Sequence, residues 1–310
     1  MKKIKMITNE VLTFAEGCNL YLDDCRKRNL REATINHYRQ SYAQFYKFIN
    51  KDMPVNEFDE KLYSEFVIYL KRKLNKDVSI NSYLRDLITT LHFLMREGYV
   101  EEFKMQSIKV DKDNVSTYTE NELQKLLQKP NLKKCKYIEY QSWVITNFLF
   151  TTGARQRSMM NIKINDIDFD NNVVKLSVTK NRKALIVPIS IKMADILKEF
   201  LKHRNAKNNS DWLFCNVFGE KLVKSTCYNM LCQYNRGRGV ETTGIHRYRH
   251  TFAKQWILNG GNVVVLSQIL GHSNLSITQN YINLLVSDVS KQVEEINLLD
   301  KFTGKKHIKM

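Results

Sequence analysis

Apolar residues return every three or four positions through most of the first hundred residues of the chain. Such spacing places them along one face of a helix, where they can be buried together against a neighbour. Thr34 stands where a helix would receive its N-terminal cap, and Gly98 stands where the last repeat stops. The pattern predicts a helical domain over residues 1–104, with helices at residues 11–28, 34–49, 60–73 and 79–97.

A change of pattern follows this domain. Residues 105–116 show no clear period and mix lysine with aspartate, so they are expected to link two domains. Thr119 and Glu122 then stand three apart before a run of leucines, which is the spacing of a capping box at a helix start. This start opens a second predicted domain over residues 117–297, and residues 298–310 follow as a basic tail.

The second domain combines two periods. Residues 137–150 are largely apolar and predict a helix that ends at Gly153. From Ile164 the apolar residues alternate with polar ones, which is typical of strands. Strands are expected at 173–178 and 185–189, around turns at Asn171-Asn172 and 181–183. Further helices are expected at 191–204, 225–234 and 252–270, the last broken at Gly260-Gly261, with a mobile basic loop at 236–239.

These patterns predict an α-rich protein of two domains, an N-terminal helical domain and a mixed α/β domain with a small antiparallel sheet. The length of 310 residues suffices for two domains, and hydrophobic residues, at 43%, are numerous enough to fill their cores. The formal net charge of +17 favours a polyanionic partner, of which nucleic acid is the first candidate. A lysine-rich genome would also raise this charge.

Basic residues gather near the expected helix ends of the first domain. They could grip a DNA backbone or form only a solvated face. They are Arg26, Lys27, Arg28, Arg31, Lys71, Arg72, Lys73 and Lys76.

Cysteine usage and the N-terminus indicate the compartment. The six cysteines form no Cys-x-x-Cys pair and are expected to be reduced, mostly buried thiols. The basic N-terminus is not followed by a long apolar run, so neither a secretory signal nor a membrane span is predicted. The expected location is the cytoplasm.

Chemistry-bearing side chains gather in the last third of the chain. Two imidazoles, His246 and His272, stand with the guanidinium of Arg249 and the phenol of Tyr281, and no carboxylate stands among them. Arginine can hold phosphate oxygens with two parallel hydrogen bonds. A tyrosine hydroxyl is a poor nucleophile near neutral pH until a base or a cationic pocket assists it. The set therefore suits a phosphate under attack.

Two patterns could be taken for metal sites. His246 and His250 stand four apart, but no glutamate follows the first as in a zinc protease. We interpret His250 as a residue that supports the site. Asp166, Asp168 and Asp170 alternate without the glycine and glutamate of a calcium loop, so a polar sheet face and its turn explain them better. No metal and no cofactor are expected.

The residues from His246 to Phe252, then Leu270-Gly271-His272, then Tyr281, resemble the second conserved box of the tyrosine recombinase (phage integrase) family. The run from Thr151 to Arg155 resembles the first box. The resemblance implies a site-specific recombinase that cuts and rejoins double-stranded DNA through a 3′-phosphotyrosine, without metal or ATP. It also implies that the helical domain binds DNA opposite the catalytic domain.

The resemblance assigns a role to each residue of the candidate site. Tyr281 is the nucleophile, and Arg155 and Arg249 bind the phosphate. His246 assists proton transfer from the tyrosine, and His272 is a second hydrogen-bond donor to the phosphate. A lysine on a hairpin protonates the leaving 5′-oxygen. Lys180 is the expected residue, seven residues before Val187-Pro188, and Lys183 is its rival.

The sequence departs from the family after the first arginine. The family usually has an acidic residue where Ser158 stands, and Arg157 is an extra cation. The lost carboxylate normally orients its neighbours, so the local geometry of the site is left open. Tyr248 replaces the usual leucine.

Alternatives and partners complete the predictions. A type IB topoisomerase-like enzyme and a catalytically silent DNA-binding protein are the other readings. The resemblance implies a homo-tetramer on paired DNA sites, with accessory DNA-bending proteins possible and no membrane.

After Tyr281, apolar residues recur at helical spacing from Leu285 to Ile296. That helix could dock on its own domain or on a neighbouring subunit.

Overall fold

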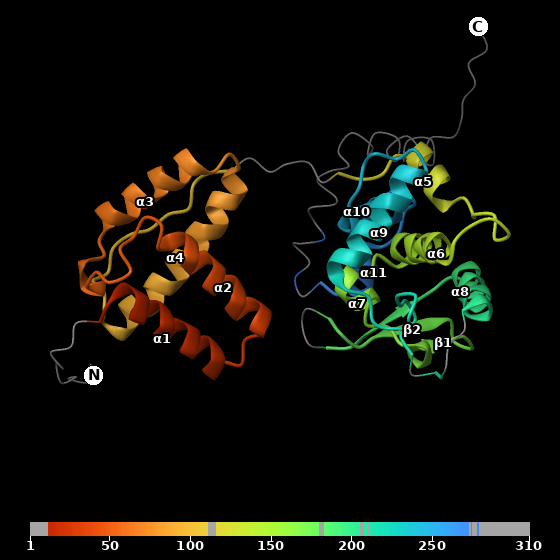
Figure 1. Ribbon diagram of the computed structural model, residues 1–310, viewed down its shortest axis with the longest axis horizontal. Coiled ribbons are helices and arrows are strands. Elements are labelled where there is room, and N and C mark those ends of the chain that lie inside the picture. The colour runs from red at the N-terminus through yellow and green to blue at the C-terminus, as the bar shows by residue number, and fades with distance from the viewer. Residues whose placement is uncertain are drawn as a thin grey trace, which may run out of the picture. The chain divides into compact units, whose positions relative to one another are not determined.

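The computed structural model describes residues 12–110, 116–179, 183–204, 208–209, 211–272, 274 and 278. The chain divides into two compact units, Met1–Asp113 and Asn114–Met310 (Figure 1). The first unit is helical, and the second combines helices with one small sheet. The predicted fold class is therefore confirmed.

The described part of the first unit packs four helices around one core. They are α1 (Phe14–Lys27), α2 (Glu32–Phe45), α3 (Glu60–Lys73) and α4 (Asp77–Glu97), with a 3-10 turn at Val55–Glu57. Aromatic and leucine side chains fill the core, including Phe14, Phe45, Phe66 and Leu84, all fully buried. A capping box of Thr13 and Glu16 starts α1. Gly98, in the left-handed conformation with φ of 82°, ends α4 as predicted.

The start of α2 corrects one prediction. The helix begins at Glu32 with Arg31 as its N-cap, so Thr34 lies in the first turn and does not cap it. The chain turns at Asn29 in a left-handed conformation, with φ of 54°, and enters the helix almost at once. The helix α4 likewise begins at Asp77, two residues before the expected Ser79. The charge of Asp77 is favourable in a first helical turn.

The second unit is built around α6 (Tyr137–Thr152). This helix is buried on nearly every side, which explains its largely apolar sequence. It packs against α8 (Ile191–His203), α9 (Lys224–Gly237) and α10 (Ile245–Leu258). Shorter helices complete the unit: α5 (Glu120–Leu127), α7 (Gln156–Met159) and α11 (Val263–Leu270). The capping box of Thr119 and Glu122 starts α5 as predicted.

A three-stranded antiparallel sheet lies in the second unit (Figure 1). Its strands are β1 (Ile167–Asp168), β2 (Val173–Leu176) and β3 (Leu185–Pro188), and a 3-10 turn at Ile164–Asp166 precedes them. Val174 pairs with Val187, both buried, so one face of the hairpin is apolar. Pro188 has no N–H to donate and pairs at the end of an edge strand, where proline is tolerated.

Of two loop predictions, one is confirmed and one is wrong. Asp168 accepts hydrogen bonds from the backbone of Asp170 and Asn171, so it shapes a turn as predicted. The expected mobile loop at 236–239 is wrong. The helix α9 continues to Gly237, and Arg238 donates to the Gln128 carbonyl at 3.1 Å while its guanidinium lies 5.1 Å from the Tyr234 ring. These contacts hold the segment to the body of the unit.

Gly153 ends α6 in a left-handed conformation, with φ of 61°. A Cβ atom there would lie 2.5 Å from Cδ1 of Phe252 and 2.7 Å from Cδ2 of Leu270. Gly239 shares the conformation, with φ of 68°, but a Cβ atom on it would meet nothing within 4 Å. Alanine substitutions at the two glycines can therefore distinguish two losses of stability, the one caused by the left-handed backbone conformation and the one caused by the steric clash.

We expect Gly239→Ala to lower the free energy of unfolding by about 1 kcal/mol, the cost of a side chain in this conformation. Gly153→Ala should lower it by about 2–4 kcal/mol, because overpacking is added. Urea unfolding followed by tryptophan fluorescence measures both values, since Trp143, Trp212 and Trp256 all lie in the second unit. An equal decrease in the free energy of unfolding in both variants would show that the steric clash at Gly153 has no effect.

Candidate active site

The helix α10 carries two of the candidate residues, His246 and Arg249, in its first two turns, and a buried polar network fixes its position. Tyr248 is 1% exposed and donates through its hydroxyl to Oδ1 of Asn235 at 2.8 Å. Asn235 donates to the hydroxyl of Tyr118 at 2.9 Å, and the rings of Tyr118 and Tyr248 lie 4.6 Å apart. The backbone N–H of Tyr118 donates to Oγ1 of Thr251. With this side of the helix held inward, Arg249 reaches the neighbouring helix ends.

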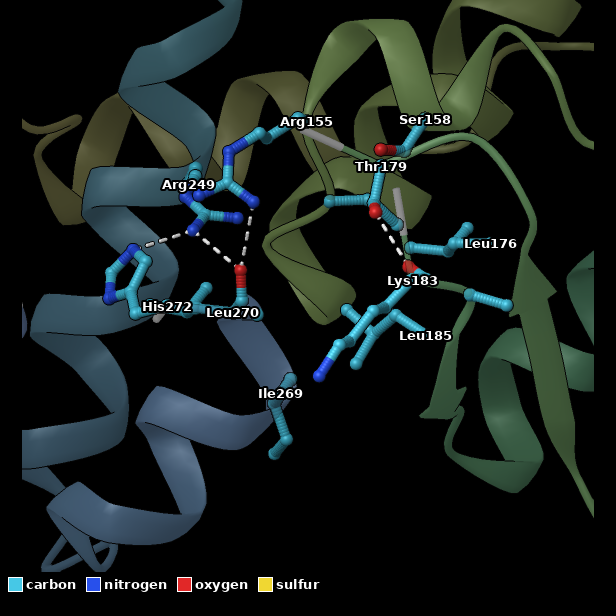
Figure 2. Close-up of a pocket in the computed structure, with 13 residues that line it drawn as sticks. Arg155, Ser158, Leu176, Thr179, Lys183, Leu185, Arg249, Ile269, Leu270 and His272 are labelled. Atoms are coloured by element: carbon cyan, nitrogen blue, oxygen red, sulfur yellow. Dashed lines mark hydrogen bonds between the residues drawn. The ribbon is translucent and has the colours of Figure 1, made fainter. Parts of the chain in front are cut away.

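Arg249 joins the ends of two helices. Its guanidinium donates to the carbonyl of Gly153 at 2.8 Å and to the carbonyl of Leu270 at 2.8 Å (Figure 2). Gly153 is the C-cap of α6, and Leu270 is the last residue of α11. Carbonyls at helix C-termini lack partners within the helix and carry partial negative charge. Two backbone carbonyls thus supply acceptors to a guanidinium that is only 5% exposed.

Arg155 meets Arg249 at the same oxygen. Its guanidinium donates to the Leu270 carbonyl at 3.1 Å. Figure 2 shows both guanidinium groups directed to this carbonyl. Arg155 stands two residues after Gly153, so the sharp turn at the end of α6 delivers it to the site.

His272 follows the left-handed Gly271 that ends α11. Its Nε2 lies 2.7 Å from a guanidinium nitrogen of Arg249, and its Nδ1 lies 2.8 Å from Oγ1 of Thr278. Burial lowers the pKa of His272 to about 4, and the charges of Arg249 and Arg155 add to this effect. The ring is therefore neutral near pH 7.

The two histidines of α10, His246 and His250, are also neutral near pH 7. Partial burial lowers the pKa of His246, and Arg249, Arg155 and Lys224 lower it further. Burial lowers the pKa of His250 to about 4, with His246 and Arg249 contributing. Each imidazole lies among cations, so protonation is costly.

A cavity of about 490 Å³ opens beside the two arginines. Lys183 extends into it, as Figure 2 shows, and the hydroxyl of Thr179 donates to the Lys183 carbonyl at 2.6 Å. Among the described residues that line it there are cations and hydroxyls but no carboxylate. They are Ala154, Arg155, Ser158, Leu176, Thr179, Lys183, Ala184, Leu185, Arg249, Ile269, Leu270, Gly271 and His272.

The structure thus brings Arg155, Arg249 and His272 into one hydrogen-bonded group. His246 lies one helical turn before Arg249 and within its electrostatic influence. Lys180 and Tyr281 lie outside the described residues, as does the expected C-terminal helix. Lys180 directly follows Thr179, which does line the cavity.

Two neighbours of the site escaped the sequence analysis. Thr278, fully buried, contacts His272, and its place three residues before Tyr281 is a signal that could have marked it. Lys224, at the start of α9, acts on His246 through its charge. Lys224 lies far from the other residues in sequence, so no local pattern could have found it.

Other predicted features can be placed as well. All six cysteines are free, and five of them are buried. Within the described ranges, no group of three His, Cys, Asp or Glu side chains could hold a metal ion. No helix in that part of the chain has the length and apolar character needed to cross a membrane.

Comparison with known proteins decides the family. Residues 116–287 match the phage integrase family, and residues 13–110 match the phage integrase SAM-like domain. The chain belongs to the phage integrase family. Tyrosine recombinase XerA of Thermococcus onnurineus is 30% identical over 240 residues, which cover 76% of this chain and 81% of the relative. Tyrosine recombinase XerC of Leptospira interrogans is 26% identical over 265 residues, covering 83% and 85%.

Solved structures agree on the fold of this recombinase. The Tn1549 transposon integrase in complex with circular intermediate DNA aligns with a TM-score of 0.69 at 20% identity, covering 86% of this chain and 94% of that one. The protein is a tyrosine-type site-specific recombinase, as the sequence predicted. These results favour that class over the topoisomerase-like enzyme and the catalytically silent DNA-binding protein.

The lowered pKa of His250 predicts how stability depends on pH. The folded state holds this group near pKa 4, against an ordinary value near 6.5. Its contribution is therefore fully present above about pH 6.5 and is lost as pH falls toward 4. We expect the free energy of unfolding to drop over this window by on the order of 1–2 kcal/mol more in the native protein than in His250→Gln. Urea unfolding at a series of pH values measures this difference. Parallel plots of the free energy of unfolding against pH for the two proteins would contradict the prediction.

Proposed function

We propose that this recombinase cuts double-stranded DNA by attack of Tyr281 on a phosphodiester held between Arg155 and Arg249. The tyrosine oxygen forms a bond to phosphorus, the bond to the 5′-oxygen breaks, and a 3′-phosphotyrosine results. The convergence of both guanidinium groups on the Leu270 carbonyl is the observation that carries this proposal. Two sets of N–H donors that reach one oxygen can also hold one phosphate.

The two arginines would stabilise the charge that grows on the non-bridging oxygens during attack. Fixed cations in a partly enclosed site act most strongly where charge develops. The missing carboxylate at Ser158 supports this, because it leaves the cavity lining positive among the described residues. The energy of the phosphodiester stays in the phosphotyrosine, so rejoining needs neither ATP nor metal.

His246 would accept the proton of the attacking hydroxyl. The lowered pKa leaves its imidazole neutral near pH 7, which is the form that can act as a base. The charges of Arg249 and Arg155 that lower it also favour an ionised tyrosine nearby. His272 would donate a hydrogen bond to the phosphate.

The leaving 5′-oxygen requires a proton, and Lys180 is the proposed donor. The cationic surroundings would lower the pKa of a lysine that approaches the arginines. Lys183 is the competitor that the structure places in the cavity. The two lysines stand three positions apart in the sequence, so both are tested.

Duplex DNA is the proposed partner of both units. In the first unit, Arg26 and Arg28 form ion pairs with Asp23 and Asp24. In the same unit, four exposed cations stand where α3 ends and α4 begins, and no described carboxylate lies within ion-pair distance of them. These are Lys71, Arg72, Lys73 and Lys76. We assign backbone contacts to this second group.

We further propose that four subunits act on two paired DNA sites. A lambda integrase of the same fold, at 17% identity, was solved as a dimer bound to a core site, which supports assembly on DNA. The helix expected after Tyr281 would link neighbouring subunits in a closed ring. Accessory DNA-bending proteins would assist. Sedimentation of the protein with duplex sites counts the subunits.

Tyr281→Phe should abolish covalent attachment to DNA and leave DNA affinity within about three-fold, because one hydroxyl alone is lost. Suicide substrates that trap the covalent intermediate, separated on denaturing gels, measure the adduct. Tyr228→Phe, an exposed tyrosine on α9, is the matched control and should retain the adduct. A covalent adduct formed by Tyr281→Phe would show that Tyr281 is not the nucleophile.

Lys180→Ala should slow cleavage by about 100-fold or more, within the usual range of a lost general acid. A substrate with sulfur at the 5′-bridging position should largely restore the rate, because a thiolate leaves without a proton. Lys183→Ala is the paired variant. If Lys183→Ala is rescued by sulfur and Lys180→Ala is not, the general acid is Lys183.

A further inference from the structure

His272 is held at both ring nitrogens. Nε2 lies 2.7 Å from a nitrogen of Arg249, and Nδ1 lies 2.8 Å from the hydroxyl oxygen of Thr278. Thr278 is fully buried, and Tyr281 follows it by three residues. Figure 2 shows the His272 ring beside the Arg249 guanidinium, at the edge of the cavity.

The chemistry of the partners fixes where the proton of the ring lies. A guanidinium can only donate hydrogen bonds, so Nε2 must accept from Arg249. A neutral imidazole carries one proton, which must then be on Nδ1 and must point to the Thr278 oxygen. In this arrangement neither ring nitrogen can donate to a phosphate.

The role proposed for His272 needs the opposite arrangement. A donor to phosphate must carry its proton on Nε2, and Nδ1 then becomes an acceptor. A threonine hydroxyl both donates and accepts, and it changes role by rotating its own hydrogen. Thr278 can therefore satisfy Nδ1 in either state while the ring keeps its place.

We infer that Thr278 is a positioning residue that lets His272 exchange tautomers when the phosphate binds. The inference rests on the proposed function. The phosphate takes the N–H of Arg249 that Nε2 accepts in the free protein. Nδ1 then releases a proton to water, Nε2 takes one from water, and the Thr278 hydroxyl turns to donate to Nδ1. No net proton is gained or lost by the ring.

The buried position of Thr278 makes it suited to this task. A fully buried hydroxyl meets little competing water, so its bond to Nδ1 restrains the ring. Partners of this kind, bound to the second nitrogen of a functional histidine, fix its orientation and tautomer.

The test compares single-turnover cleavage by variants of the full chain. Thr278→Val keeps the shape and removes the hydroxyl, and it should lower the rate by about 10- to 100-fold with DNA affinity within about three-fold. Thr278→Ser keeps a hydroxyl and should recover the rate to within about three-fold of the native value. Thr90→Val removes an equally buried hydroxyl from the first unit and should leave the rate within about two-fold.

A double-mutant cycle separates this role from packing. In a His272→Ala background, Thr278→Val should slow cleavage by less than about two-fold, because the ring that it positions is gone. Full additivity of the two effects, or a native rate in Thr278→Val, would overturn the inference.

A ¹⁵N spectrum of histidine-labelled protein without DNA gives a readout that does not depend on cleavage. The proton of His272 should be on Nδ1 in the native protein and, because Arg249 still donates to Nε2, should stay on Nδ1 in Thr278→Val. A proton on Nε2 in the native protein would overturn the inference. A native protein that shows the expected spectrum yet forms no adduct would instead contradict the proposed function.

Discussion

One carbonyl oxygen, that of Leu270, holds the two arginines of the site together. Two guanidinium groups repel each other, and their approach requires an acceptor between them. The oxygen stands at the C-terminal end of α11, where backbone carbonyls are unpaired and partial negative charge collects. A carboxylate in this place would bind the arginines more strongly, but it would also cancel part of their positive charge. A neutral acceptor keeps the cations in position and leaves the site positive.

This view explains the departure from the family at Ser158. The side chain lines the cavity and is 5% exposed, so an acidic residue there would be placed close to the arginines. A hydroxyl adds no charge. The carbonyls of Gly153 and Leu270 supply acceptors to Arg249 that do not depend on any side chain. The geometry of the arginines is therefore preserved by the backbone of two helix ends.

Sequence reasoning succeeded where a local rule acts on neighbouring residues. The capping box of Thr119 and Glu122 and the stop at Gly98 follow from hydrogen bonds within a few positions. It failed at Thr34, because a favourable cap residue was overruled by the turn at Asn29. It failed again at Arg238, whose partners Gln128 and Glu139 lie about a hundred positions away in the chain. Distant contacts decide such segments, and no local spacing records them.

In the candidate site, too, local sequence spacing predicted some features and distant contacts determine the others. Motif spacing singled out Arg155, Arg249 and His272, which the structure joins by hydrogen bonds. The common acceptor of Arg155 and Arg249 could not be foreseen, because every residue has a backbone carbonyl and it leaves no mark in a sequence. Lys183 was considered only as a rival, and its entry into the cavity follows from the fold of the hairpin.

The contacts of Tyr118 have a mechanical consequence. This residue is among the first described residues of the second unit. It contacts α10 through Thr251 and the ring of Tyr248, and it contacts α9 through Asn235. A pulling force on the preceding segment would enter the second unit at Tyr118 and pass directly to the helix that carries Arg249. Tension at the start of the second unit is therefore carried to the N-terminal half of α10 by the contacts of one residue.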